Sequence, residues 1–260
     1  MIIVDKLCYS SRLRYVNTTE KMVFSMLTLV LCIVSRSILT AVLVIIVNSF
    51  LILVKGKIPA KRYWKLMSIP FVFLLLSTIA ILVDISRVPM DCYALKIGEY
   101  YITNSWKQVL YGFQLIFTAL ASVSCLYFLS LNTPMTDILT ALRKIHIPSL
   151  LVELMMLIYR YIFILMEISD NIKSSQDSRL GNKDYKTSIK SFSGMISVLF
   201  VRAVKKADAQ YCGLESRGYN GEIRVLTEHY PPKTIDMIMI AIFEILLLSL
   251  VIWQKIYFHR

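Results

Sequence analysis

Long apolar runs, separated by short charged segments, make up most of the first half of the chain. Residues 22–54 are nearly all apolar apart from Ser35–Ser37 and Asn48. This run is too long for one membrane crossing, which needs roughly 20 residues, and an arginine at a helix centre costs about 2.5–3.5 kcal/mol. We therefore predict two helices that meet at a turn around Arg36, the first capped by Thr18 or Thr19. A signal peptide is the alternative interpretation, but no small-residue cleavage site or hydrophilic mature start follows the run.

Three further apolar runs predict crossings at about residues 63–84, 108–131 and 234–253. Residues 55–65 carry five basic residues and no acidic one, and Lys and Arg collect in cytoplasmic loops. Residues 85–107 have nearly balanced charge and fit the opposite side. The pattern therefore predicts about five transmembrane helices, with the amino terminus inside and the carboxyl terminus outside. Glu244, near the middle of the last one, is either a hydrogen-bonded bundle residue or a contact for a partner.

The segment that follows Pro134 is amphipathic rather than continuously apolar. Ile138 and Leu142 fall on one face of a short helix, and a third amphipathic helix is predicted over residues 187–206. Between them, residues 150–168 carry a polar stripe at every seventh position, and both an interfacial position and a crossing remain open for this helix. The predicted regions are an amino-terminal membrane region (1–134), a cytoplasmic or interfacial region of coupling helices (135–232), and a last transmembrane helix with its tail (233–260).

Composition agrees with a membrane protein. Hydrophobic residues make up 57% of the 260 residues, charged residues make up 18%, and the mean hydropathy is +0.62. Soluble domains contain about 45–50% apolar and about 25% charged residues. Too little polar surface therefore remains to coat a water-soluble globule. This composition also excludes a disordered chain. The net charge of +12 comes without basic runs interleaved with aromatic residues, which argues against nucleic acid as a partner. The fold class is therefore an all-α integral membrane protein.

The sequence contains no motif for catalysis or for nucleotide binding. It has no phosphate-binding GxxxxGKS/T loop, no HExxH and no GxSxG. Its three histidines are far apart, and its five scattered cysteines form no CxxC pair. A membrane-embedded hydrolase that uses Glu153, Glu167 and a histidine is the alternative from another functional class, but the histidines lie in loops or at the terminus. We therefore predict that the chain is not an enzyme.

Two arginines each follow a predicted helix in a setting of small residues. Arg179 lies within Ser178–Gly181, and Arg217 lies within Glu215–Gly218. Small neighbours let another backbone approach closely, and a guanidinium can pair bidentately with a carboxylate. Most exposed arginines are ordinary solvated residues. Two such sites on one charged region with amphipathic helices nevertheless indicate a docking surface.

The chain resembles the transmembrane T component of energy-coupling factor (ECF) transporters, in the cobalt group called CbiQ. The similarity runs nearly end to end and is carried by Asp5–Lys21, Asn132–Pro148, Tyr159–Phe163, Ser178–Gly181 and Glu215–Tyr219. In that family, two arginine signatures end cytoplasmic coupling helices that seat in grooves on two ABC-type ATPase subunits.

The resemblance implies that Arg179 and Arg217 anchor the ATPase subunits. It also implies that their neighbours shape the contact: Ser178, Gly181, Glu215, Ser216 and Gly218. The usual signature of the family is Ala-Arg-Gly. Here serine replaces alanine twice, and Leu180 follows the first arginine, so the second site is the closer match.

The resemblance also implies the partners and the cofactors. The partners would be two ABC-type ATPase subunits, a substrate-capture (S) membrane subunit and the lipid bilayer. ATP and Mg²⁺ would bind to the ATPase subunits and cobalt to the capture subunit, so that this chain itself binds no cofactor and no metal. The location would be the inner or plasma membrane of a prokaryote, which the chain crosses several times. A nickel or vitamin importer of the same type is the alternative, since nothing in the sequence identifies the substrate.

Overall fold

The computed structural model describes residues 3–82, 84–86, 93–97, 100–104, 106–145, 147–219 and 231–258. The chain forms two compact units. The bundle unit comprises Ile2–Pro134 and His229–Arg260, and the arm unit comprises Met135–Glu228.

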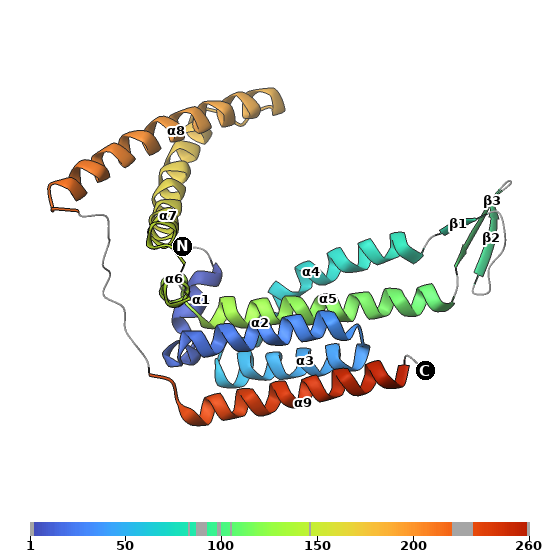
Figure 1. The fold of residues 1–260 in the computed structure, drawn as a ribbon. Helices are drawn as coiled ribbons and strands as arrows, with labels where there is room; N and C mark the ends of the chain where they lie inside the picture. Colours follow the sequence, from blue (N-terminus) through green and yellow to red (C-terminus); the bar gives the residue numbers. More distant parts are fainter. Residues whose placement is uncertain are drawn as a thin grey trace. The chain divides into compact units, whose positions relative to one another are not determined.

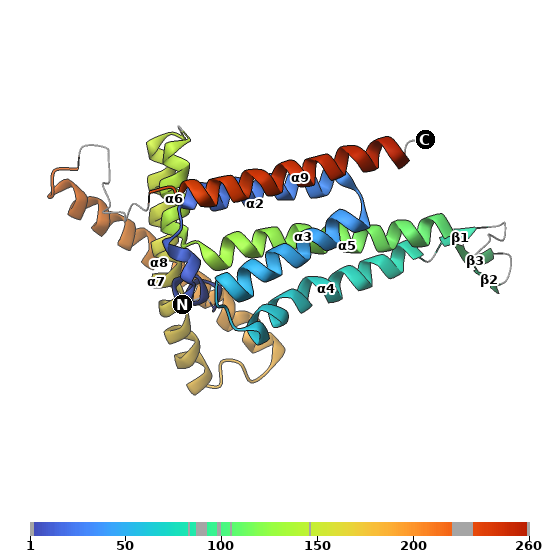
Figure 2. The ribbon, with the colours of Figure 1, turned by 90° about the horizontal axis from the view of Figure 1, so that it is seen from below.

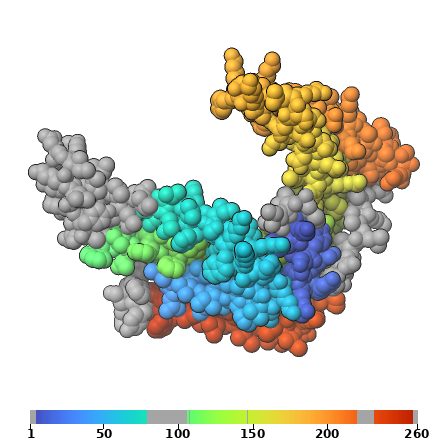
Figure 3. Space-filling view, turned by 180° about the vertical axis from the view of Figure 1, so that it is seen from behind, coloured from blue at the N-terminus to red at the C-terminus, as the bar shows by residue number. Residues whose placement is uncertain are grey.

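The bundle unit consists of long helices that lie side by side (Figures 1 and 2). α5 (Trp106–Asn132) is its central helix, because it contacts α2 (Thr18–Ser35), α3 (Ile38–Phe50) and α4 (Ala60–Leu82). α9 (Thr234–Phe258) packs on α2. On the face drawn in Figure 3, α3 (blue) lies between α4 (cyan) and α9 (red).

Three short elements complete the helical part of this unit. They are α1 (Ile3–Ser10), the 3-10 helix η1 (Arg12–Tyr15) and the π-helix η2 (Leu51–Lys55), which continues α3. Hydrogen bonds from Ser11, just before η1, and from Lys21, in the first turn of α2, both reach Asn132 at the end of α5. Ser11 Oγ donates a hydrogen bond to Asn132 Oδ1 at 2.7 Å, and Lys21 Nζ donates to the carbonyl of Asn132 at 3.1 Å.

The predicted break in the first apolar run is confirmed. Arg36 has a left-handed backbone conformation, with φ of 45°, and separates α2 from α3. The predicted cap is wrong by one or two positions. Asn17 is the capping residue, and its Oδ1 accepts a hydrogen bond from the backbone N–H of Thr19 at 2.9 Å. An asparagine side chain is among the strongest acceptors at this position, so the helix begins at Thr18.

Glu244 of α9 is buried, with 9% of its surface exposed. Neither of its carboxylate oxygens has a hydrogen-bond partner within the described residues. The interpretation of Glu244 as a hydrogen-bonded bundle residue is therefore not supported there, and a contact to a partner stays a prediction.

A small antiparallel sheet between α4 and α5 was not predicted. Its strands are β1 (Asp84–Ser86), β2 (Tyr93–Ile97) and β3 (Tyr100–Asn104), in the order β1-β3-β2. Leu95 pairs with Ile102 in the β2–β3 ladder. The sequence indicates only a charge-balanced outer loop here, because each strand is too short for a clear alternation of polar and apolar residues.

In the described residues of the arm unit there are three helices: α6 (Met135–Lys144), α7 (Ser149–Ser178) and α8 (Tyr185–Glu215). α7 packs against both α6 and α8. The two longer helices extend beyond the predicted ranges 150–168 and 187–206. The additional turns contain further charged residues, such as Asp170 and Lys173 in α7 and Asp208 in α8, so the apolar pattern that defined the predicted ranges ends before the helix does.

Six helices among the described residues are long and apolar enough to cross a membrane, judged by length and composition. Their spans are Thr18–Ser35, Ile38–Lys55, Gln108–Asn132, Ser149–Ser178, Tyr185–Glu215 and Thr234–Ile256. The chain is therefore a multi-pass, all-α membrane protein with one small sheet. α4, whose first turns carry Lys61, Arg62 and Lys65, is not among the six, so the predicted third crossing stays a prediction. α7 is among them, and both possibilities for residues 150–168 remain open.

Candidate functional site

α7 ends in a tight turn that contains the first predicted arginine. The backbone N–H of Gly181 donates to the carbonyl of Gln176 at 2.7 Å, and the N–H of Leu180 donates to the carbonyl of Asp177 at 3.1 Å. This pair of bonds defines a Schellman motif, in which the residue after the helix cap has a left-handed conformation. Leu180 is that residue, with φ of 58°, and Arg179 is the cap.

α8 ends in the same motif. The backbone N–H of Tyr219 donates to the carbonyl of Leu214 at 3.0 Å, and the N–H of Gly218 donates to the carbonyl of Glu215 at 3.0 Å. Gly218 has the left-handed conformation, with φ of 73°. Arg217 therefore occupies the position in the second turn that Arg179 occupies in the first.

The equivalence extends to the residues in front of each arginine. A carboxylate residue and a serine precede it in both turns, as Asp177–Ser178 and as Glu215–Ser216. Arg179 and Arg217 are exposed, and within the described part of the chain neither guanidinium makes an ion pair or a hydrogen bond. The C-terminal end of a helix carries partial negative charge, which stabilises a cation there. Each helix thus presents an arginine whose donors are available to another molecule.

The two turns differ at the left-handed position. Leu180 adopts this conformation with a side chain that is 68% exposed, although a left-handed conformation costs a residue with a Cβ atom about 1–2 kcal/mol. Gly218 adopts it without that cost. The departure from the Ala-Arg-Gly signature that the sequence analysis noted at Leu180 therefore falls on the one position of the turn where glycine is favoured.

The first turn is fixed to the beginning of α8. Ser191 Oγ donates to the carbonyl of Gly181 at 2.7 Å, and Gln176 Nε2 donates to the carbonyl of Ser191 at 2.8 Å. A Cβ atom at position 181 would lie 2.9 Å from both the carbonyl oxygen of Gln176 and the Ser191 hydroxyl. Gly181 is therefore required for close approach of the backbone.

The second turn is fixed to the beginning of α7 by residues that the sequence analysis did not assign to the site. The hydroxyl of Tyr219 donates to Glu153 Oε2 at 3.0 Å, and Arg143 of α6 lies 3.9 Å from Glu153 Oε1. Glu153 is only 2% exposed. Its hydrogen bond raises the pKa of the Tyr219 hydroxyl above the ordinary value, so this hydroxyl stays a donor at neutral pH.

A signal for Glu153 was present in the sequence. Glu153 begins the predicted seven-residue stripe that continues through Arg160 and Glu167, and of these three only Glu153 is buried. A carboxylate at the start of an apolar helix is costly to bury without partners. The sequence could not supply those partners, because Tyr219 lies 66 residues further along the chain.

No cluster of metal ligands occurs in the part of the chain that the structure describes. There, no group of three or more histidine, cysteine, aspartate or glutamate side chains could hold a metal ion. The histidines of the hydrolase alternative (His146, His229 and His259) lie outside the described residues. Buried Glu153 and exposed Glu167 are about four turns apart on α7, and the partners of Glu153 are those of a structural contact.

Comparison with known proteins gives the family. The family model described as cobalt transport protein, CbiQ, matches residues 10–229. Over 253 residues the chain is 32% identical to an uncharacterized protein of Methanocaldococcus jannaschii. The matched region covers 97% of this chain and 94% of that protein. Over 223 residues it is 26% identical to the cobalt transport protein CbiQ of Salmonella typhimurium, covering 85% and 99% of the two chains. A cobalt transport protein CbiQ of Rhodobacter capsulatus is 34% identical over 113 residues, covering 44% of this chain and 46% of that protein. With most of its length matched, the chain belongs to the CbiQ family of cobalt transport proteins and is a membrane component of cobalt transport.

Proposed function

We propose that this chain is the coupling (T) subunit of an ECF-type ABC importer for cobalt ions. In this role it transmits movement from two ATPase subunits to a substrate-capture subunit in the cell membrane of a prokaryote. The observation that carries the proposal is the repeated turn at the ends of α7 and α8. Each copy places an arginine in the same position, exposed and without a partner among the described residues.

The repetition suits a contact to two similar partners. An ABC-type ATPase pair offers two copies of one groove, and a groove lined by carboxylates would accept a guanidinium bidentately. Both turns are held by side-chain hydrogen bonds, from Ser191 in one case and from Tyr219 in the other. A movement of either ATPase subunit would therefore pass into a long helix rather than into a loose loop.

The chemistry of transport is divided among the subunits. ATP and Mg²⁺ bind to the ATPase subunits, and cobalt is held by the capture subunit. The sequence of this chain has no phosphate-binding loop, and its described residues include no cluster of metal ligands. The proposed role of this chain is mechanical, with Arg179 and Arg217 as the anchoring residues.

Copurification from membranes tests the proposal. The tagged chain should bring with it two ATPase subunits that contain phosphate-binding loops and a small membrane protein that binds cobalt. Arg217→Glu reverses the charge at the anchor and should lower the amount of copurified ATPase at least tenfold, since charge-assisted hydrogen bonds contribute about 1.5–3 kcal/mol.

Arg202→Glu is the matched control, because Arg202 is an exposed arginine within α8 that lies outside the turn. It should leave the copurified ATPase unchanged. Unaltered copurification and cobalt uptake in the Arg217→Glu protein would contradict the docking role.

A further inference from the structure

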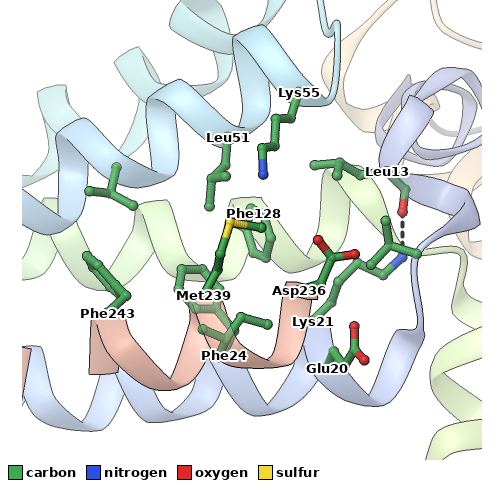
Figure 4. Close-up of a pocket in the computed structure, with 13 residues that line it drawn as sticks. Leu13, Glu20, Lys21, Phe24, Leu51, Lys55, Phe128, Asp236, Met239 and Phe243 are labelled. Atoms are coloured by element: carbon green, nitrogen blue, oxygen red, sulfur yellow. Dashed lines mark hydrogen bonds between the residues drawn. The ribbon is translucent and has the colours of Figure 1, made fainter. Parts of the chain in front are cut away.

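A cavity opens at one end of the bundle unit, between α2, α5, α9 and the π-helix η2 (Figure 4). Its volume is about 210 Å³, whereas one water molecule needs roughly 10–15 Å³ by the same measure. Most of the lining is apolar and includes Phe24, Phe128, Phe243 and Met239. Such walls do not hold ordered water, which needs two to four polar partners.

Charged side chains are confined to one level of this cavity. Glu20 lies in the first turn of α2, Asp236 lies in the first turn of α9, and Lys55 is the last residue of η2. The three residues thus lie at the ends of three candidate membrane-spanning segments, and these ends are on the same side of the bundle. In Figure 4, Lys55 extends into the cavity from the η2 side, opposite Asp236 and Glu20.

The apolar lining lies deeper along the same helices. Phe24 is one turn further along α2, Phe243 is two turns beyond Asp236 along α9, and Leu51 is one turn before Lys55. The cavity therefore has a charged level at the edge of the membrane and an apolar level inside it. A phospholipid has this division between headgroup and acyl chain.

Glu20 requires a positive partner that the described residues do not provide. Its side chain is 8% exposed, and both carboxylate oxygens lack hydrogen-bond partners within the described part of the chain. Asp236 adds a second negative charge close enough to act on it, and the backbone N–H of Lys233 lies nearby but outside hydrogen-bond geometry. A buried carboxylate without a counter-charge is strongly disfavoured. Buried Glu20, with the partly exposed carboxylate of Asp236 beside it, therefore indicates a cation.

The lysine that follows Glu20 in the sequence is already engaged. Lys21 Nζ donates to the carbonyls of Leu13 at 3.0 Å and of Asn132 at 3.1 Å. On the other side, Lys55 forms no ion pair within the described residues, so its ammonium is available to an anion. The charged level thus offers two carboxylates and, separately, one lysine.

We propose that this cavity binds one phospholipid whose headgroup carries a primary ammonium and a phosphate, as in phosphatidylethanolamine. The ammonium lies between Glu20 and Asp236, and the phosphate contacts Lys55. A primary ammonium has three N–H donors for the two carboxylates, whereas a quaternary ammonium has none. One acyl chain then lies along the aromatic lining, and the bound lipid joins α9 to α2 and η2. This proposal does not depend on the coupling role of the chain.

Native mass spectrometry of the full-length, delipidated protein tests the proposal. The protein is incubated with micelles that contain equal amounts of phosphatidylethanolamine, phosphatidylcholine and phosphatidylglycerol. We expect one phosphatidylethanolamine per chain to be retained in preference to the other two lipids. Glu20→Gln and Lys55→Gln should each weaken that binding by about tenfold or more, because each removes the charge of a charge-assisted hydrogen bond.

Two matched substitutions outside the cavity serve as controls. Glu244→Gln removes another buried carboxylate of the same unit that also lacks a partner among the described residues, and Lys61→Gln removes an exposed lysine near Lys55. Both should leave lipid binding unchanged. Equal retention of the three lipids, or equal losses in the controls, would overturn the proposal. Binding of Co²⁺ alone that competes with the lipid and disappears in Glu20→Gln would identify a metal site instead.

Discussion

At the scale of single residues, the two arginine turns differ in the residue that follows each arginine. Leu180 and Gly218 have the same hydrogen-bond pattern and similar φ values, of 58° and 73°. This left-handed backbone conformation is sterically unfavourable for leucine, which has a Cβ atom, and is not for glycine. The first turn is thus held in place by its contacts to Ser191, despite an unfavourable residue at its centre.

Leu180→Gly should therefore stabilise the protein by about 1 kcal/mol, since it removes the left-handed strain and loses little packing from a 68% exposed side chain. The reciprocal change, Gly218→Leu, should destabilise it by about 1–2 kcal/mol. Thermal unfolding of the purified protein in detergent measures both effects. Leu151→Gly, at a half-exposed position inside α7, is the control and should lower the unfolding temperature. A lower unfolding temperature for Leu180→Gly would contradict the strain argument.

The hydrogen bond between Tyr219 and Glu153 gives a second prediction at this scale. Tyr219→Phe removes the donor, so the end of α8 should open more often and the backbone amides of residues 214–219 should exchange hydrogen faster. Hydrogen exchange followed by mass spectrometry measures this directly. Tyr211→Phe is the control, because Tyr211 is an exposed tyrosine of α8 and its replacement should leave the exchange unchanged.

The pH dependence of this contact follows from the raised pKa of Tyr219. The protonated hydroxyl is the donor, so the stabilising effect is complete below the ordinary tyrosine pKa of about 10. It is lost only as the pH rises through the raised value. The difference in exchange between wild type and Tyr219→Phe should therefore be constant from about pH 6 to pH 9. A contact that weakened within this range would mean that another group controls it.

At the scale of helices and strands, the sequence predicted the features that depend on the chemistry of neighbouring residues along the chain. Arg36 in an apolar run marked a helix boundary, because a charge inside the membrane is costly, and that boundary is confirmed. The ends of α7 and α8 were placed too early, because charged residues follow the apolar stripes while the helices continue. β2 and β3 were missed because antiparallel pairing is a contact between segments, and five-residue strands leave little periodicity.

The junction between η2 and α5 provides a prediction at this scale. A Cβ atom at Gly56 would lie 2.6 Å from the carbonyl oxygen of Ile52 and 2.7 Å from Asn132 Oδ1. Gly56→Ala should therefore displace Asn132, which also accepts a hydrogen bond from Ser11, and destabilise the bundle by about 1–3 kcal/mol. The unfolding temperature in detergent is the measurement.

A second glycine gives the control for this substitution. A Cβ atom at Gly213, inside α8, would meet nothing within 4 Å. Gly213→Ala should be neutral or stabilising by up to about 1 kcal/mol, since alanine is the better helix former. Equal effects of the two substitutions would show that the junction between η2 and α5 does not need glycine at position 56 for close packing.

At the scale of the whole molecule, the positions of the two arginines relative to the membrane decide whether they can act together. The sequence identified both residues by their setting and by family resemblance. It could not show the common turn geometry, because Gly218 is the residue typical of this turn and Leu180 is not. The sequence also left open whether α7 crosses the membrane. If α7 and α8 both lie at the surface, Arg179 and Arg217 are on one side. If both helices cross, Arg179 lies on the side opposite to Arg217.

The native cysteines allow this question to be tested with little engineering. Cys212 is exposed on α8, five residues before Arg217, whereas Cys8, Cys32 and Cys125 are buried. Cys92 lies outside the described residues, in the segment predicted to be extracytoplasmic. Ser178→Cys adds a label site beside Arg179, on an exposed residue.

We expect a membrane-impermeant maleimide to modify Cys212 and the introduced Ser178→Cys thiol only in inside-out vesicles, because the coupling role requires both turns on the ATP-containing side. Cys92 should react only in intact cells. Cys212→Ser and Cys92→Ser are the controls that assign each signal. Modification of position 178 from outside, together with modification of Cys212 from inside, would mean that α7 and α8 both cross the membrane. In that case only Arg217 could contact an ATPase subunit, and the equivalence of the two turns would have no role in docking.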